Sequence, residues 1–85
     1  MKKVIIYTTP TCGYCKMAKA YFKDNNIAYI EKDVAIDQSA ADEMINKSGQ
    51  MGVPVIAISD EDGGNEQLII GFDQSALASA LGIGV

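Results

Sequence analysis

Apolar residues in this chain fall into short blocks whose spacing predicts strands and helices. β-Branched apolar runs bounded by turn residues predict four strands, over residues 3–8, 27–32, 53–58 and 67–70. Apolar residues at helical spacing predict three helices, over residues 12–24 and 38–48 and, near the end of the chain, after Asp73. The residues expected to form the apolar faces of these helices are Met17, Ala18, Tyr21 and Phe22 in the first, Ala41, Met44 and Ile45 in the second, and Leu77, Ala78 and Leu81 in the third.

Capping residues mark the ends of these helices. Asp37 and Asp73 are expected to be N-caps, because an aspartate side chain accepts hydrogen bonds from free amides of the first turn. Asn25-Asn26 ends the first helix, and Gly49 and Gly82 end the other two.

The elements follow one another in the order βαβαββα. A strand–helix–strand start implies a parallel strand pair joined by a right-handed crossover. The acidic, glycine-rich segment 60–65 predicts a turn between the last two strands, which are then antiparallel. We therefore expect an α/β fold in which a four-stranded mixed sheet is flanked by three helices. At 85 residues, the chain is expected to form a single domain over residues 1–85.

Composition and charge exclude several classes of protein. The net charge is −4 and arginine is absent, which argues against nucleic-acid binding. The apolar run at the start of the chain is too short for a signal peptide, and no segment is long enough to span a membrane. We therefore expect a cytoplasmic protein with no membrane partner. In that reducing compartment a cysteine pair is more often catalytic or metal-binding than structural.

The two cysteines of the chain, Cys12 and Cys15, lie where a predicted strand gives way to a predicted helix. A Cys-x-x-Cys pair in that position is typical of a redox-active dithiol. The first turn of a helix has unpaired amides and a partial positive charge, and both favour a thiolate. We therefore predict that Cys12 is the nucleophile and that Cys15, one turn deeper, is the resolving thiol.

Lysines are concentrated around this motif. Residues 1–23 contain five lysines and no acid, whereas residues 24–85 contain eleven acids and two lysines. Lys16, one turn after Cys12, is the candidate for stabilising its thiolate. Lys19 and Lys23 are expected to form a solvated helix face. The basic setting also suggests a partner that presents an acidic patch.

Three segments resemble motifs of the glutaredoxin family. Residues 7–19 (YTTPTCGYCKMAK) resemble the active-site stretch of the family, residues 48–54 (SGQMGVP) its Ser-Gly-x-x-Thr-Val-Pro segment, and residues 70–73 (IGFD) its Gly-Gly-x-Asp-Asp segment. The motifs occur in the family order and span nearly the whole chain. The likeness is strongest to short bacterial glutaredoxin-like redoxins, which include the NrdH-type proteins that reduce ribonucleotide reductase.

This resemblance implies a thioredoxin fold, thiol–disulfide chemistry and roles for further residues. Pro54 would be a cis-proline facing the cysteines, and Val53 would pair with the backbone of a bound substrate. Without the resemblance, a trans proline at the start of a strand is the simpler interpretation. Tyr14 would line the site, or alternatively pack on the core. The residues implied to bind substrate or glutathione are Thr11, Tyr14, Val53, Pro54, Gly71, Asp73 and Gln74.

Four positions depart from the family pattern, and they leave the electron donor open. Gly13 replaces a common proline, Gly52 a threonine, Thr9 a lysine of glutathione-using members, and Gln74 the second aspartate of the last motif. Asp73 is retained, although an N-cap role is sufficient to explain it. The oxidised protein would be reduced again by a thioredoxin-reductase-like enzyme or by glutathione as a co-substrate. No resident cofactor or metal is expected, the substrates would be proteins with disulfides, and the protein is expected to be a monomer.

Two other functions are open at this point. The resemblance allows an iron–sulfur cluster held through Cys12 in a glutathione-assisted dimer. A dimer would be needed because two cysteines and no histidine cannot complete a ligand set in one chain. The cysteines could instead be structural. A disulfide between them would close too short a loop to stabilise the fold much through chain entropy.

Overall fold

A computed structural model describes residues 2–62 and 64–82, and within these ranges the chain forms four strands and three helices. In chain order they are β1 (Lys3–Thr8), α1 (Gly13–Asp24), β2 (Ile30–Asp33), α2 (Gln38–Ser48), β3 (Val55–Ser59), β4 (Gln67–Ile70) and α3 (Gln74–Leu81). The strands form one sheet in the order β2-β1-β3-β4. β1 is parallel to β2 and antiparallel to β3, and β3 and β4 form a hairpin. The predicted element order and mixed sheet are confirmed.

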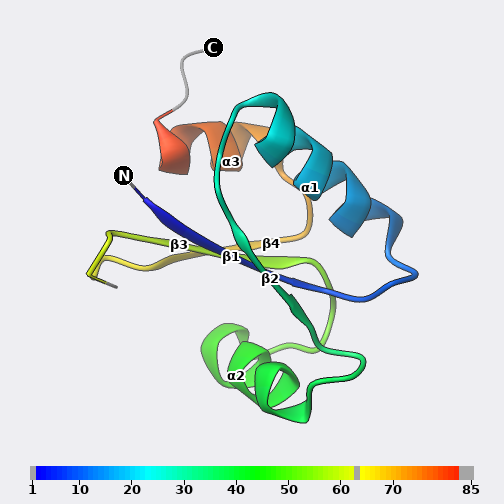
Figure 1. The fold of residues 1–85 in the computed structure, drawn as a ribbon. Coiled ribbons are helices and arrows are strands. Elements are labelled where there is room, and N and C mark those ends of the chain that lie inside the picture. The colour runs from blue at the N-terminus through cyan, green and yellow to red at the C-terminus, as the bar shows by residue number, and fades with distance from the viewer. Residues whose placement is uncertain (1, 63, 83–85) are drawn as a thin grey trace.

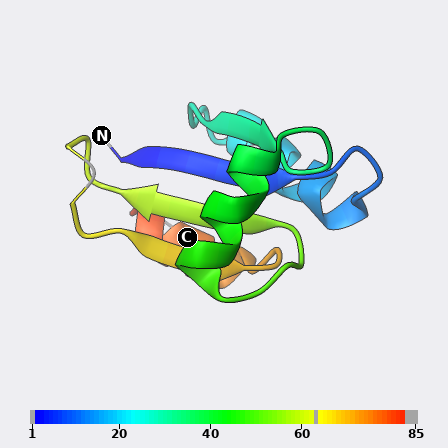
Figure 2. The ribbon, with the colours of Figure 1, turned by 90° about the horizontal axis from the view of Figure 1, so that it is seen from below.

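The sheet is the middle of three layers. Helices α1 and α3 cover one face and α2 covers the other (Figure 1). Figure 2 shows α2 lying across the strands. The larger core cluster lies between the sheet and α1 and α3, and its buried members are Val4, Ile6, Ala18, Phe22, Ile56, Ile58, Ile69 and Leu77. The smaller cluster lies beneath α2 and contains Ile5, Tyr7, Met44, Val55 and Ala57.

The ends of the helices follow the predicted capping residues. The carboxylates of Asp37 and Asp73 each accept a hydrogen bond, 3.1 Å long, from an amide in the first turn of α2 and α3. Gly49 and Gly82 end these helices with φ angles of 73° and 70°. Glycine adopts this left-handed conformation without steric cost, which explains why both helices stop there.

The second strand begins at Ile30, later than predicted. Asn26 adopts a left-handed conformation with φ of 57°. The amide of Ile27 then donates to the carbonyl of Phe22 at 2.8 Å. These interactions turn the chain back over the end of α1, so that Ile27 packs against the core and does not enter the sheet. The prediction of a strand over 27–32 is therefore wrong at its start.

The third strand also begins later than predicted, at Val55. The Val53–Pro54 peptide bond is cis, and proline has no N–H to donate to a strand partner. The carbonyl of Pro54 still accepts a hydrogen bond from the amide of Gly71 at 2.8 Å. This bond joins the start of β3 to the end of β4, where Gly71 has a φ of 80° that favours glycine.

The buried face of α1 differs from the predicted one. Met17, expected in the core, is 52% exposed. The buried residues of α1 are Cys15, Ala18 and Phe22, at spacings of three and four. Because each helical residue turns the chain by about 100°, Met17 lies on the opposite side of the helix from this face. The sequence pattern missed that a cysteine belongs to the core.

The other two helices agree better with their predicted faces. In α2 the buried residues are Ala40 and Met44, so the predicted face is right at Met44 and shifted by one residue at its start. In α3, Leu77 and Ala78 are buried as predicted, and Leu81 packs partly against the core.

Candidate active site

Three chain segments meet at one end of the sheet. Tyr7, near the end of β1, pairs with Val55 at the start of β3, which in turn pairs with Ile70 at the end of β4. The register therefore brings residues 9–12, before α1, close to the segment before β3 and the segment after β4. Helices α1, α2 and α3 each begin at this end of the sheet (Figure 1).

Cys12 lies at the start of α1 and caps it. Its backbone is extended, with φ of −88° and ψ of 112°. Its Sγ accepts a hydrogen bond from the amide of Cys15 at 3.1 Å. The predicted helix start is thus one residue early, because Cys12 is the N-cap and not a helical residue. The sulfur therefore lies at the end of the helix where the amides are unpaired and the partial charge is positive.

Cys15 lies in a different environment. Both cysteines are free thiols, but Cys12 is half-buried and Cys15 is only 1% exposed. Burial raises the pKa of the Cys15 thiol to about 12, and its hydrogen bond with the side chain of Cys12 acts in the same direction. The backbone of Thr9 and the charge of Lys19 oppose this rise. Cys15 is therefore protonated at neutral pH, and Cys12 is the accessible thiol.

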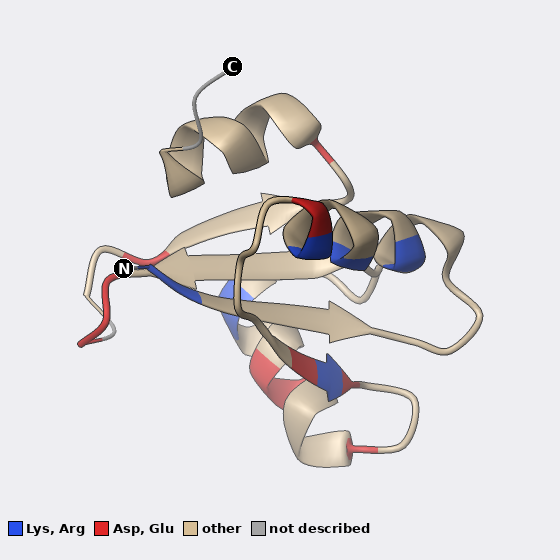
Figure 3. Cartoon of the chain, turned by 45° about the horizontal axis from the view of Figure 1, so that its top comes forward, with Lys and Arg blue, Asp and Glu red and all other residues tan. Residues whose placement is uncertain are grey.

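The side chains along α1 only partly match their expected positions. Tyr14 is 63% exposed, so the alternative that it packs on the core is wrong. Lys16 is exposed. Lys19 is not simply solvated as expected, because its Nζ forms an ion pair with Oε2 of Glu31 at 2.8 Å and its side chain is only 26% exposed. Figure 3 shows the lysines of α1 along one side of the helix.

The segment before β3 contains the cis peptide bond that the resemblance implied. The bond before Pro54 is cis, and the trans alternative is wrong. Pro54 is buried and Val53 is half-buried. Since Gly71 donates to the Pro54 carbonyl, Val53, Pro54 and Gly71 form one connected unit at the end of the sheet that holds the cysteines.

The remaining predicted binding residues lie on the surface. Thr11 is exposed just before Cys12, and Gln74 is exposed as the first residue of α3. The carboxylate of Asp73 accepts the amide of Ala76, so the N-cap role that sufficed to explain it is confirmed. At Gly13, no atom lies within 4 Å of where a Cβ would stand. Packing therefore does not require glycine at this position.

A polar network under α2 was missed by the sequence interpretation. The hydroxyl of Tyr7, on a fully buried side chain, donates to the carboxylate of Glu43. Lys32 Nζ lies 3.0 Å from Oε1 of the same carboxylate. Burial and the hydrogen bond to Glu43 raise the pKa of Tyr7, and the contacts with Tyr7 and Lys32 lower that of Glu43. A tyrosine in a buried strand was the available signal, because its hydroxyl needs a partner.

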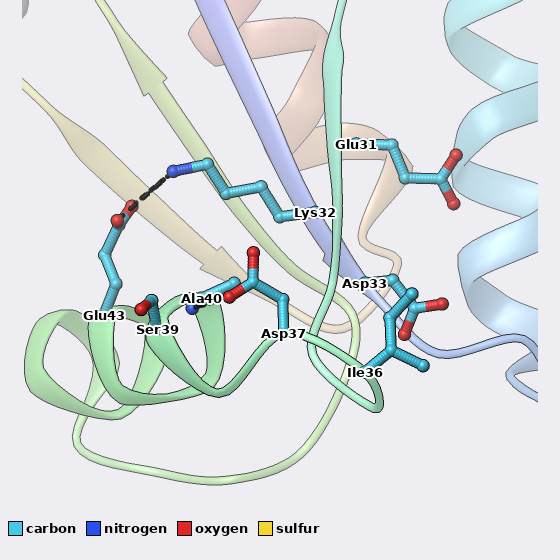
Figure 4. A pocket seen from close by; sticks show the side chains of 8 residues that line it. All are labelled: Glu31, Lys32, Asp33, Ile36, Asp37, Ser39, Ala40 and Glu43. Carbon is cyan, nitrogen blue, oxygen red and sulfur yellow. Dashed lines mark hydrogen bonds and ion pairs between the residues drawn. The ribbon is translucent and has the colours of Figure 1, made fainter.

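The network borders a hollow of about 250 Å³ between β2 and α2 (Figure 4). Glu43 and Lys32 line it, and neither cysteine does. A second hollow of about 290 Å³, between β4 and α3, is also lined by other residues. Cys12 is thus reached from the surface at the end of the sheet and not through either of these hollows.

Comparison with known proteins identifies the family. The glutaredoxin family model matches residues 4–62. The chain belongs to the glutaredoxin family. It is 43% identical, over 72 residues, to a glutaredoxin-like 8.6 kDa protein of the rubredoxin operon of Clostridium pasteurianum, with 85% of this chain and 88% of that protein covered. It is 38% identical, over 58 residues, to glutaredoxin 3 of Escherichia coli, with 68% and 70% covered.

Solved structures agree with this membership. The glutaredoxin-family chain superposes on the crystal structure of a mutant of the thioredoxin-like protein BC3987 with a TM-score of 0.81. The two sequences are 28% identical, and the match covers 99% of this chain and 100% of the other. The expected thioredoxin fold is confirmed, and family membership supports a thiol–disulfide redox function.

Residues 2–62 and 64–82 were also compared with the requirements of a metal site and of a membrane-spanning helix. No group of three or more His, Cys, Asp or Glu residues in these ranges is placed to hold a metal ion. The family matches do not favour the iron–sulfur alternative. None of the helices in the same ranges is long and apolar enough to cross a membrane.

Proposed function

We propose that this glutaredoxin-family protein is a dithiol oxidoreductase that reduces disulfides in other proteins. The observation that carries the proposal is the unequal setting of its two cysteines. Cys12 caps α1 with its sulfur on the amide of Cys15, and it is the more exposed thiol. Cys15 is buried one turn deeper and holds its proton.

The reaction has two exchange steps. The Cys12 thiolate attacks one sulfur of the substrate disulfide, forms a mixed disulfide and releases the other sulfur as a thiolate, which takes a proton from water. Cys15 then loses its proton and attacks Cys12 Sγ. The bond between Cys12 and the substrate breaks, and its electron pair leaves on the substrate sulfur. The substrate has gained two electrons, and Cys12 and Cys15 are left as a disulfide.

We propose that a thioredoxin-reductase-like flavoenzyme, in preference to glutathione, reduces this disulfide again. Thr9 supplies no cation where glutathione-using members carry lysine, and Gln74 supplies no carboxylate. The Asp73 carboxylate is already used within α3. Glutathione is then at most a co-substrate, and no resident cofactor takes part.

The exposed residues around Cys12 are proposed to receive the substrate. Tyr14 and Thr11 would contact its side chains, and Val53, held beside Pro54, would pair with its backbone. Lys16 would support the Cys12 thiolate. We further propose that residues 1–85 act as one monomeric redox domain in the cytoplasm, as part of electron transport and cell redox homeostasis.

Turnover with each reductant tests this function. Insulin disulfides would be reduced with NADPH and thioredoxin reductase, and a glutathionylated peptide with glutathione and glutathione reductase. We expect activity in the first assay, loss of it in Cys12→Ser, and a trapped mixed disulfide in Cys15→Ser. Robust deglutathionylation that survives Cys15→Ser would sink the preference for a flavoenzyme. An alkylation rate of Cys12 at pH 6 no faster than that of an ordinary thiol would sink the redox function itself.

A further inference from the structure

An ion pair between Lys19 and Glu31 lies one turn of α1 beyond the buried thiol of Cys15. The Lys19 side chain is half-buried, and its Nζ is 2.8 Å from Oε2 of Glu31. The same oxygen accepts a hydrogen bond from Oγ1 of the buried Thr8 at 2.9 Å. Figure 4 shows Glu31 pointing from β2 toward the side of α1, while its neighbour Lys32 points to the opposite side. Thr8 of β1 and Glu31 of β2 therefore fix the position of the Lys19 ammonium on α1.

Among the lysines of α1, Lys19 is the one aligned with Cys15. At about 100° of rotation per residue, it lies about 40° around the helix from Cys15, against about 100° for Lys16 and about 80° for Lys23. Lys16 and Lys23 are both exposed. Of these three lysines, Lys19 is the one whose charge lowers the pKa of Cys15, against the larger effect of burial.

The resolving step requires a Cys15 thiolate, which a nearby positive charge stabilises. Because burial raises the pKa of Cys15 to about 12, only a very small fraction of this residue is thiolate at pH 7. The thiolate is the attacking species, so anything that stabilises it speeds resolution. Each unit by which the pKa falls raises the thiolate fraction tenfold but lowers its nucleophilicity, which leaves a net gain of about 3.5-fold.

We propose that Lys19 supports the resolving step by stabilising the negative charge that Cys15 carries as it attacks Cys12, and that Glu31 is a positioning residue that acts through Lys19. The proposal rests on the dithiol mechanism above and assigns a role that the mechanism leaves unfilled. The Cys15 proton leaves to solvent, and no further reactant is needed. The other titratable groups involved are Cys12, which acts on Cys15, Tyr29, which acts on Lys19, and Lys23, which acts on Glu31 but not on Cys15.

A single-turnover reaction with dithiobis(nitrobenzoate) separates the two steps. Attack by Cys12 releases a first nitrothiophenolate, and attack by Cys15 on the mixed disulfide releases a second. In Lys19→Met we expect the second release to slow roughly threefold to tenfold at pH 7, and its pH profile to move to higher pH. The first release should stay within about twofold of the wild-type rate. Lys19→Arg, which keeps the charge, should restore most of the second rate.

Lys23→Met is the matched control, because it removes the same charge from an exposed site one turn further along α1. Both releases should then stay within about twofold of wild type. Glu31→Gln should slow the second release less than Lys19→Met, and it should add no further slowing when the two substitutions are combined. The proposal is overturned if Lys19→Met leaves the second release and its pH profile unchanged, or if Lys23→Met slows it equally. Absence of a fast first release in the wild type would instead refute the proposed function.

Discussion

The two faces of the sheet are built from different chemistry. Against α1 and α3 the core is apolar and aromatic, with the ring of Phe22 5.4 Å from that of Tyr29 and 6.1 Å from that of Tyr21. Against α2 the core is smaller, and it contains the fully buried Tyr7, whose hydroxyl is hydrogen-bonded to the carboxylate of Glu43. Glu43 joins Tyr7 to Lys32, which places titratable groups in the packing of this face.

The difference lies in where the redox cysteines and the buried tyrosine–carboxylate network are found. Cys15 is on the buried face of α1 and Cys12 caps this helix, whereas the network lies on the other face of the sheet. Groups with shifted pKa values occur on both sides of the sheet. We therefore expect apolar substitutions on the α1 face to change stability without changing its pH dependence, and substitutions in the network beneath α2 to change both.

Phe22→Ala should have the largest effect. It removes a fully buried ring from the larger core, and the cavity should lower the free energy of unfolding by about 3–5 kcal/mol. Urea unfolding measures this loss, which is a large part of the stability of a small domain. Met17→Ala, on the exposed side of the same helix, should stay within about 0.5 kcal/mol. Equal losses in the two variants would show that the faces of α1 are wrongly assigned.

Tyr7→Phe should have an intermediate effect. It removes the hydroxyl that donates to the charged Glu43, at an expected cost of about 1.5–3 kcal/mol near pH 7. The raised pKa means that the fold favours neutral Tyr7. As pH rises through about 10 the unfolded chain loses the Tyr7 proton while the fold keeps it, so stability falls.

Tyr7→Phe should lack this part of the fall in stability at alkaline pH. Urea unfolding at pH 7 and at about pH 10.5 measures it. Tyr21→Phe, on the other face of the sheet, is the control and should leave the alkaline slope unchanged. An alkaline slope that persists in full in Tyr7→Phe would contradict the role assigned to the network.

Glu43→Gln should have the smallest effect, about 0.2–1 kcal/mol near pH 7, because the amide carbonyl can still accept the Tyr7 hydroxyl and only the partly exposed ion pairs with Lys32 and Lys47 are lost. The lowered pKa of Glu43 in the fold means that its ionised form contributes stability above its unfolded pKa of about 4.3. That contribution disappears as pH falls through the folded value.

The stability difference between wild type and Glu43→Gln should therefore shrink as the pH falls below the unfolded pKa of about 4.3. Both proteins should react equally fast with dithiobis(nitrobenzoate), since Cys12 lies on the opposite face. A difference that is constant with pH would show that the carboxylate contributes nothing through its charge.

Local signals were sufficient for much of this fold. The N-caps Asp37 and Asp73 and the stops Gly49 and Gly82 depend on neighbours within a few residues, and each occurs where it was predicted. The placement of Cys12 at the start of α1 follows from the same kind of local pattern. Turn and strand composition also located β4, because its hairpin needs no distant partner.

The features that the sequence did not predict depend on how the helices and strands pack against one another. Met17 and Lys19 were misplaced because the rotation of α1 is decided by which residues fill the core, and Cys15 does so. Alternation along β2 indicates the face on which Glu31 lies but not which helix side chain it meets there. The contacts between Lys19 and Glu31, like that between Tyr7 and Glu43, join residues distant in the sequence and needed the three-dimensional structure.

The unequal burial of the two thiols also governs how the protein survives oxidants. A peroxide that reaches Cys12 converts it to a sulfenic acid, and further oxidation to a sulfinic acid would be irreversible. Cys15, in hydrogen-bond contact with Cys12, can condense with the sulfenic acid first and return it to a reducible disulfide. Because Cys15 is only 1% exposed, bulky electrophiles do not consume the group that performs this repair. The pair is therefore expected to protect its more accessible member, Cys12, from permanent damage.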